Sequence, residues 1–208
     1  MEYQAKLRHW FSYVVDPVAR ALLRLGVTPN MLTIAGFGVN IVTGIALGLS
    51  RLVTGGLLIL AGGSFDMLDG SAARQSGLKK SSGALLDSVV DRYSEAAIFL
   101  GLAVHFHKVG NFIGLVMTFA AMIGSFLVSY VRARAEGLDI ECKVGLMQRT
   151  ERLVLLSAGL IFQGLFHRIG LIRSEILITS VVSALAVLAH ATAIHRLAFS
   201  FRRLEERV

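Results

Sequence analysis

Six stretches of this chain each contain about 20 mainly apolar residues, the length at which an α-helix crosses a bilayer core of roughly 30 Å. Hydrophobic residues make up 54% of the sequence and charged residues only 17%, and the mean hydropathy is +0.66. Backbone polar groups must find partners within the chain in lipid, so such stretches predict membrane helices. We expect an all-α integral membrane fold with six transmembrane helices, near residues 30–50, 52–75, 82–107, 109–136, 149–168 and 174–200.

An amphipathic segment precedes the first predicted span. Apolar residues such as Trp10, Val14 and Leu22 are interspersed there with basic residues such as Lys6 and Arg20. This pattern is typical of a helix that lies on the membrane surface. The sequence therefore predicts two parts, an amphipathic helix over 1–27 and a membrane domain over 28–208.

Both prolines of the chain follow a residue that can cap a helix. Proline is tolerated at the first helical position, and the side chain of Asp or Thr accepts a hydrogen bond from the first turn. We therefore expect helices to begin at Asp16-Pro17 and at Thr28-Pro29.

The basic residues predict the orientation in the membrane. All but four of the 21 lysines and arginines fall on the side that holds both termini; the exceptions are Arg51, Lys108, Arg168 and Arg173. The positive-inside rule places the basic side in the cytoplasm, so we expect a multi-pass protein of a prokaryotic cytoplasmic membrane. The net charge of +7 then reflects flanking residues or phosphorylated ligands, and nucleic acid is not an expected partner.

Four aspartates lie in the second and third predicted spans. Asp66 and Asp69 are three residues apart, and Asp87 and Asp91 are four apart, so each pair shares one helix face. A short basic turn over 75–81 joins the two helices and predicts that they are antiparallel neighbours. We expect all four carboxylates to converge near the cytoplasmic ends of these helices.

This acidic group needs positive partners. One aspartate in mid-membrane costs about 2.5–3.5 kcal/mol on insertion scales, and four together also repel one another. Oxygen ligands without a nearby Cys or His favour Mg²⁺ or Mn²⁺, with Ca²⁺ as a further option. The simpler alternative, helix caps or ion pairs with Arg74 and Arg92, explains a single aspartate better than four on two facing stripes.

Small residues and one arginine accompany the acids. Gly70 follows Asp69 directly, and Ala73 and Gly83 lie nearby. A glycine inside a helix costs about 1 kcal/mol relative to alanine, so Gly70 indicates the close approach of a ligand or a backbone. Arg74, one turn further on, offers bidentate donors for a phosphate, although an arginine at the membrane interface needs no ligand.

These positions together read Asp66-x2-Asp69-Gly70-x2-Ala73-Arg74-x8-Gly83-x3-Asp87-x3-Asp91, a pattern that resembles the signature of the CDP-alcohol phosphotransferase family. The resemblance implies that Asp66, Asp69 and Asp87 bind Mg²⁺ or Mn²⁺, with two ions expected. Asp91 would lie near the metals as the fourth acidic residue of the metal site and would act as the general base. Gly70, Ala73 and Gly83 would make room for the CDP-lipid, and Arg74 would hold its diphosphate. A homodimer is also implied.

A second basic group lies around the fourth to sixth spans and consists of Arg132, Arg134, Arg149, Arg152 and Arg196. More cations than one diphosphate needs indicate a phosphorylated acceptor, although a positive-inside collar would give a similar pattern. Residues 129–137 and 144–153 resemble the phosphatidylinositol-phosphate synthase branch of the family. This likeness implies that Arg132, Arg152 and Arg196 grip the phosphate of inositol 1-phosphate.

The expected reaction is transfer of a phosphatidyl group from CDP-diacylglycerol to inositol 1-phosphate, which yields phosphatidylinositol phosphate and CMP for phospholipid biosynthesis. Two alternatives remain open. The acceptor could be glycerol 3-phosphate or another alcohol, or the chain could be a cation transporter, which predicts acids spread through the membrane depth and broken helices or repeats. The lipid tails, diacyl or ether, stay open because they would contact generic apolar helix faces.

Overall fold

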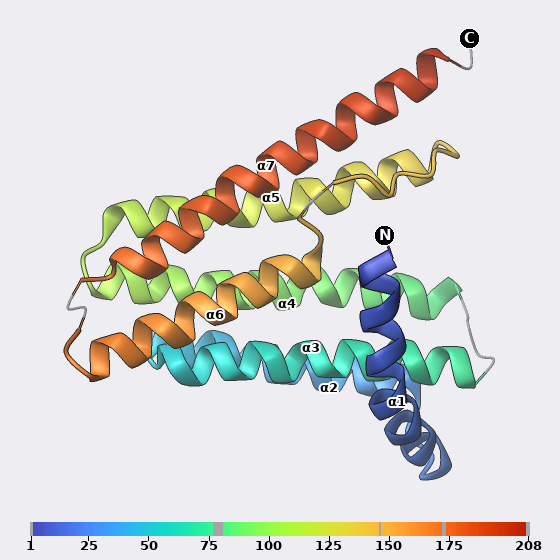
Figure 1. Cartoon of the computed structure of the whole chain (residues 1–208), viewed down its shortest axis with the longest axis horizontal. Coiled ribbons are helices and arrows are strands. Elements are labelled where there is room, and N and C mark those ends of the chain that lie inside the picture. The colour runs from blue at the N-terminus through green and yellow to red at the C-terminus, as the bar shows by residue number, and fades with distance from the viewer. Residues whose placement is uncertain (1, 77–80, 146, 172–173, 207–208) are drawn as a thin grey trace.

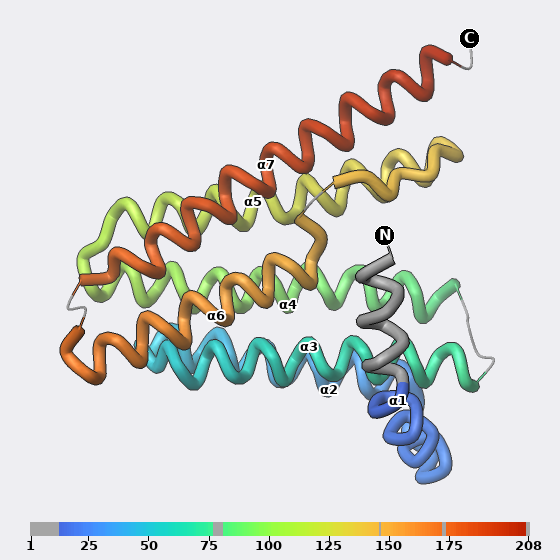
Figure 2. The backbone as a smooth tube through the Cα atoms, viewed as in Figure 1, coloured from blue at the N-terminus to red at the C-terminus, as the bar shows by residue number. Residues whose placement is uncertain are grey.

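The computed structural model describes residues 2–76, 81–145, 147–171 and 174–206. Within these residues the regular structure is entirely helical (Figure 1), and the tube in Figure 2 follows the same path. The helices are α1 (Glu2–Arg24), α2 (Pro29–Gly48), α3 (Leu52–Gln75), α4 (Ser81–Lys108), α5 (Phe112–Glu136), α6 (Arg149–Arg168) and α7 (Ile176–Glu205). The all-α prediction is confirmed, and the six predicted spans coincide with α2 to α7.

Long apolar helices and apolar outer faces identify a membrane protein. By length and composition, α2, α3, α5 and α7 are able to cross a membrane. Helices α4 and α6, with 28 and 20 residues, also have sufficient length but carry more charge. Large apolar side chains such as Ile45, Leu57 and Phe119 are exposed on the outside of the bundle. Water-soluble monomers rarely expose so much apolar surface, which lipid chains cover in a membrane protein.

The helices form two connected groups (Figure 1). Helix α2 packs against both α3 and α4, and α6 packs against α3. Helices α5 and α7 pack against each other and join the first group through α4 and α6. Helices α3 and α4 run antiparallel as predicted, and their aspartates lie close enough to interact electrostatically. In the described residues α2 provides the main contact to both, so α3 and α4 are held opposite each other.

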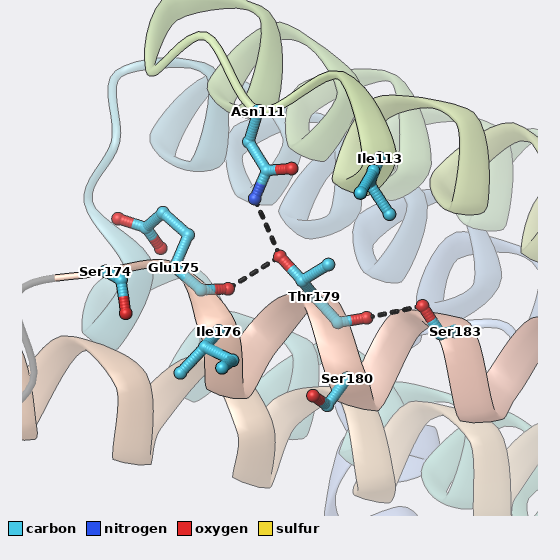
Figure 3. A pocket seen from close by; sticks show the side chains of 8 residues that line it. All are labelled: Asn111, Ile113, Ser174, Glu175, Ile176, Thr179, Ser180 and Ser183. Atoms are coloured by element: carbon cyan, nitrogen blue, oxygen red, sulfur yellow. Dashed lines mark hydrogen bonds between the residues drawn. The ribbon is translucent and has the colours of Figure 1, made fainter.

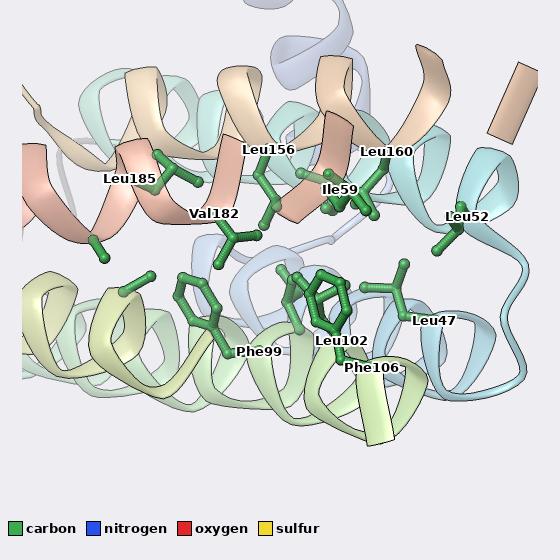
Figure 4. Close-up of a cluster of buried hydrophobic side chains, with 14 residues drawn as sticks. Leu47, Leu52, Ile59, Phe99, Leu102, Phe106, Leu156, Leu160, Val182 and Leu185 are labelled. Carbon is green, nitrogen blue, oxygen red and sulfur yellow. The ribbon is translucent and has the colours of Figure 1, made fainter. Parts of the chain in front are cut away.

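A buried apolar cluster joins the six helices α2 to α7 (Figure 4). Leu47 of α2, Ile59 of α3, Phe106 of α4, Leu160 of α6 and Leu185 of α7 are each no more than 1% exposed. Interlocked side chains from so many helices restrict how the helices slide or rotate relative to one another. This cluster therefore fixes the positions of the polar residues that project from α3, α4 and α6.

Helices α2 and α4 meet backbone to backbone. A Cβ added to Gly101 would clash with the carbonyl oxygen of Gly44, and a Cβ added to Gly44 would clash with the carbonyl oxygen of Ala97. Small residues allow this close approach in membrane bundles, where van der Waals packing drives helix association. The contact sets the position of α4, and with it Asp87 and Asp91, relative to α2.

The N-terminal helix differs from one prediction and agrees with another. Pro17 lies inside α1, so the expected helix start at Asp16-Pro17 is wrong. The Asp16 carboxylate does not cap α1; it accepts a hydrogen bond of 2.6 Å from the hydroxyl of Ser71 on α3. The start of α2 at Thr28-Pro29 is confirmed, since the Thr28 side chain accepts a hydrogen bond from the Met31 amide.

Candidate active site

The four aspartates of the signature belong to one acidic group that spans two helices. Asp66 and Asp69 lie on the second half of α3, and Asp87 and Asp91 lie on the first half of α4. Asp87 lies close enough to each of the other three to interact with it electrostatically. Asp69 is buried and the others are half-buried. The structure therefore brings together the carboxylates that the sequence spacing paired.

Asp69 is held by the first turns of α2. The hydroxyl of Thr33 donates a hydrogen bond of 2.8 Å to Asp69 Oδ2. Thr33 is itself 7% exposed and occupies a fixed place because the Thr28-Pro29 cap sets where α2 begins. A buried carboxylate with one hydroxyl donor keeps further acceptor capacity for a cation.

A guanidinium group lies between the acids of the two helices. Arg149, the first residue of α6, donates a hydrogen bond from Nη1 to Asp66 Oδ2. The same nitrogen lies 2.9 Å from Asp91 Oδ1. Asp91 also forms an ion pair of 3.3 Å with the adjacent Arg92. Arg149 therefore ties α3, α4 and α6 together at the acidic group.

The donor set suits a hard divalent cation. As the side chains stand, no three His, Cys, Asp or Glu residues of the described chain form a ready-made metal-binding group. However, the group consists of carboxylate oxygens, the ligands that Mg²⁺ and Mn²⁺ prefer. Two of these carboxylates, on Asp66 and Asp91, already share one positively charged partner from Arg149. The four aspartates therefore fit a divalent metal, which they would bind from both helices.

The residues predicted to bind the CDP-lipid lie around the acids. A Cβ at Gly70 would lie 3.5 Å from Nη1 of Arg74, so the arginine side chain folds back over the glycine. Arg74 is exposed and has no ion pair among the described residues. Ala73 is half-buried beside it on α3. Gly83 lies on α4, where a Cβ would be 3.4 Å from Asn30 Oδ1 at the start of α2.

Arg152 is part of a buried polar network. Its Nη2 donates a hydrogen bond of 2.8 Å to Glu95 Oε1, and its Nη1 donates one of 2.9 Å to the Met147 carbonyl. The hydroxyl of Ser125 on α5 donates to Glu95 Oε2 at 2.9 Å. Glu95 is 1% exposed and Arg152 is 3% exposed. This network joins α4, α5 and α6 at the inner edge of the acidic group.

The other two predicted acceptor arginines have different surroundings. Arg196 is buried on α7, where Nε donates to the Val144 carbonyl and Nη1 donates to the Val128 carbonyl, each at 2.8 Å. Arg132 is exposed on α5 and forms an ion pair of 2.8 Å with Glu136. Arg196 interacts electrostatically with Arg132 and with Arg152. The three arginines therefore lie in one neighbourhood, although their guanidinium groups do not share a common partner.

Two residues of the site were not among the predicted site residues. Arg149 was noted only as part of the basic group, because its partners lie 83 and 58 positions away, at Asp66 and Asp91. Glu95 carried a signal that was overlooked. It is an ionisable residue inside a predicted span, four positions after Asp91, and such residues usually mark a functional site or a buried ion pair.

A pocket lies at the other end of the helices (Figure 3). It has a volume of about 540 Å³ and is lined by Asn111, Ile113, Ser174, Glu175, Ile176, Thr179, Ser180 and Ser183. Asn111 donates a hydrogen bond of 2.8 Å to Thr179, which donates to the Glu175 carbonyl at 2.6 Å. Hydroxyl and amide groups dominate its polar lining, and none of the four signature aspartates reaches it. The signature region is therefore the candidate active site.

A comparison with known protein families gives the class of protein. Residues 26–195 match the family model described as CDP-alcohol phosphatidyltransferase. The matched range covers most of the chain and contains all the candidate residues except Arg196. The chain therefore belongs to the CDP-alcohol phosphatidyltransferase family of enzymes.

Individual relatives are named for one activity. The chain is 40% identical over 162 residues to the phosphatidylinositol phosphate synthase of Mycobacteroides abscessus. This alignment covers 76% of this chain and 73% of the relative. It is 34% identical over 191 residues to the archaetidylinositol phosphate synthase of Methanothermobacter thermautotrophicus, with 92% and 90% covered. The names of the two relatives differ in the lipid part, archaetidyl or phosphatidyl, and agree in the inositol phosphate part.

Solved structures agree with this relationship. The crystal structure of Mycobacterium tuberculosis phosphatidylinositol phosphate synthase with CDP-DAG bound superposes with a TM-score of 0.81 at 28% identity, and 91% of this chain and 94% of that chain are covered. A structure of the same mycobacterial enzyme in complex with manganese and citrate gives a TM-score of 0.79, also at 28% identity, with 90% and 88% covered. The likeness therefore extends over nearly the whole chain.

Proposed function

We propose that this chain transfers a phosphatidyl group from CDP-diacylglycerol to inositol 1-phosphate and releases CMP. The observation that carries the proposal is the acidic group of α3 and α4, in which Asp66, Asp69 and Asp91 of the family signature all lie within electrostatic reach of Asp87. The names of the relatives support inositol phosphate as the acceptor. The mycobacterial structure with CDP-DAG bound supports a CDP-lipid as the donor.

The aspartates divide the chemical work. Asp66, Asp69 and Asp87 would be the principal ligands of Mg²⁺ or Mn²⁺, with Asp91 as the fourth acidic residue of the metal site, and we propose two ions. When bound, these ions supply neutralisation of the diphosphate charge, the dominant need in phosphoryl transfer. Asp91 would take the proton from the acceptor hydroxyl as that oxygen forms a bond to the lipid-side phosphorus. The bond from this phosphorus to the bridging oxygen breaks, and CMP leaves with that oxygen.

The donor lipid would be oriented from α3 and α4. Arg74 is exposed, lies over Gly70 and has five N–H donors for the diphosphate. Gly70, Ala73 and Gly83 present no large side chain, so a nucleotide can approach the helix backbones. These residues would bind and orient the donor lipid, and the proton transfer would be carried out by Asp91.

The acceptor phosphate would meet the arginines of α5, α6 and α7. Arg152 and Arg196 are both 3% exposed, and a buried cation is favoured by an anionic partner. Arg152 Nε is buried and has no hydrogen-bond partner in the described part of the chain, so it has a donor to offer a phosphate oxygen. We propose that Arg132 completes this phosphate site by exchanging Glu136 for the ligand. Glycerol 3-phosphate is the alternative acceptor, because it presents the same phosphate chemistry.

The surroundings of the enzyme form part of the proposal. We propose that α2 to α7 all cross a prokaryotic cytoplasmic membrane as a domain over 28–208, with the active site facing the cytoplasm. The helix within residues 1–27 would lie on the membrane surface, and two copies of the chain would form a homodimer. The bias of basic residues toward the connections beside the active site supports this orientation.

An acceptor panel tests the proposed function. Purified protein is incubated with CDP-diacylglycerol and Mg²⁺, and CMP release is measured with inositol 1-phosphate, glycerol 3-phosphate, free inositol or serine. We expect CMP release with inositol 1-phosphate that EDTA abolishes and added Mg²⁺ restores. Release with glycerol 3-phosphate alone would keep the acidic-site chemistry and overturn the acceptor. The ether-linked CDP-lipid is run in parallel to identify the preferred tails.

A further inference from the structure

Arg149 is the one described cation that contacts signature aspartates of both α3 and α4. Its Nη1 donates to Asp66 Oδ2 and lies 2.9 Å from Asp91 Oδ1. The side chain is 18% exposed, so both ion pairs are shielded from water. Without a positive partner, the two carboxylates would repel each other across the interface of the helices. Arg149 therefore performs the neutralisation that a divalent ion would also perform.

A metal ion and this guanidinium compete for the same lone pairs. A carboxylate oxygen that binds Mg²⁺ or Mn²⁺ closely has less negative charge to offer a second cation, and the two cations repel each other. Asp66 is one of the proposed principal metal ligands, and Asp91 is the fourth acidic residue of the same metal site. Arg149 and a divalent ion are thus alternative partners of these two carboxylates.

The position of Arg149 allows it to change partners. It is the first residue of α6, and the preceding Gln148 makes no side-chain cap hydrogen bond. Its Nε is buried and lacks a hydrogen-bond partner among the described residues, so the guanidinium is only partly satisfied where it stands. Arg152 follows three positions later, at the spacing that places two side chains on one helix face. A guanidinium released from the aspartates therefore has the acceptor arginine as its neighbour.

We propose that Arg149 is an exchangeable internal cation: it neutralises Asp66 and Asp91 until a divalent ion binds them, and then turns to the phosphate groups of the substrates. This inference rests on the metal site of the proposed function. It implies an order of events in which metal and CDP-lipid bind first, and their binding frees an arginine for the acceptor phosphate. Arg149 acts here as a positioning residue for the metal ligands.

A metal-binding measurement without substrate tests the exchange. Free Mn²⁺ is titrated by electron paramagnetic resonance against purified wild type, Arg149→Gln and Arg149→Lys. Arg203→Gln is the matched control, because it removes one arginine from an exposed ion pair at the end of α7. Thermal unfolding of each protein is recorded with EDTA and with saturating Mn²⁺.

The proposal predicts tighter Mn²⁺ binding when the competitor is removed. Coupling between two sites typically changes affinity by about 5- to 150-fold, and we expect Arg149→Gln to fall in this range. Arg149→Lys keeps the positive charge but loses the planar guanidinium that contacts both carboxylates, so its gain in Mn²⁺ affinity should be smaller. In EDTA the melting temperature of Arg149→Gln should lie below that of wild type, and saturating Mn²⁺ should remove most of this difference. Arg203→Gln should match wild type in both measurements.

Different failures have different meanings. If wild type binds Mn²⁺ and neither Arg149 variant binds it more tightly, the exchange is overturned while the proposed function stands. A melting temperature of Arg149→Gln that is equally low with and without Mn²⁺ would also overturn it, because a purely structural ion pair behaves in that way. If wild type binds no Mn²⁺, the metal site of the proposed function and the exchange both fail.

Discussion

Replacing Glu95 with alanine should unfold the protein at a much lower temperature. The Glu95 side chain is 1% exposed and accepts two hydrogen bonds, from Arg152 at 2.8 Å and from Ser125 at 2.9 Å. Its loss would leave the buried Arg152 guanidinium with the Met147 carbonyl as its one hydrogen-bond partner among the described residues. An uncompensated buried charge is among the most destabilising changes that a single substitution makes.

The size of the effect follows from the burial of both partners. Removing one member of a buried ion pair costs about 3–5 kcal/mol. For a chain of this length, 1 kcal/mol corresponds to roughly 2–4 °C in melting temperature. We therefore expect Glu95→Ala to lower the melting temperature by on the order of 10 °C. The control is Glu206→Ala, which removes an exposed ion pair with Arg203 and should change the melting temperature little.

The chain carries its own reporter for this assay. Cys142 is the single cysteine of the sequence and is fully buried between α5, α7 and the segment that joins α5 to α6. A dye that fluoresces on reaction with a thiol therefore reports when this cluster opens during heating in detergent. Wild type, Glu95→Ala and Glu206→Ala are compared under identical conditions.

A double-mutant cycle separates the ion pair from other losses. Glu95→Ala combined with Arg152→Ala removes both charges, so the double variant should melt well above the value expected from adding the two single effects. Coupling of residues in direct contact is typically about 0.5–3 kcal/mol. Additive effects, or a Glu95→Ala variant as stable as Glu206→Ala, would refute the reasoning that Glu95 exists to neutralise Arg152.

Three further predictions concern the site and the packing. Asp91→Asn should lower turnover by roughly 10²–10⁴-fold, the usual contribution of a general base, while CDP-lipid binding persists by filter binding; normal turnover would remove Asp91 from that role. Arg152→Ala should raise the KM for the acceptor about tenfold or more and leave the KM for the CDP-lipid unchanged, because one charge-assisted hydrogen bond contributes about 1.5–3 kcal/mol; an unchanged acceptor KM would contradict its phosphate contact. Gly101→Ala should destabilise the protein by about 1–3 kcal/mol, because its Cβ would clash with Gly44, whereas Gly38→Ala, which has open space around it, should be neutral or stabilising.

The helices were predictable because their signals are local. An apolar stretch of about 20 residues needs no knowledge of its neighbours, and residues 52–75 and 149–168 were predicted with the bounds that the structure has for α3 and α6. The Thr28-Pro29 start was equally local. The start at Asp16-Pro17 failed because the Asp16 carboxylate bonds to Ser71 on another helix. A capping pattern is therefore reliable only where no tertiary partner competes for the capping side chain.

The site was predictable to the extent that it follows helix periodicity. Spacings of three and four residues placed Asp66 with Asp69 and Asp87 with Asp91. Periodicity gives no distance between helices, and neither it nor the short turn over 75–81 indicated that α2 packs against both α3 and α4. The contacts of Arg149 depend on the packing of α6 against α3, which no local pattern specifies.

Mass spectrometry of the lipid product tests the central claim most directly. Purified protein, CDP-diacylglycerol, Mg²⁺ and inositol 1-phosphate labelled with ¹⁸O in its phosphate group are incubated, and the lipids are extracted. We predict a lipid that contains the inositol ring and two phosphates, one of them carrying the label, in equal amount to the CMP released. Phosphatidic acid would show hydrolysis without transfer, and an inositol lipid without the labelled phosphate would show that the phosphorylated acceptor is not transferred intact. Either result would contradict phosphatidyl transfer to inositol 1-phosphate.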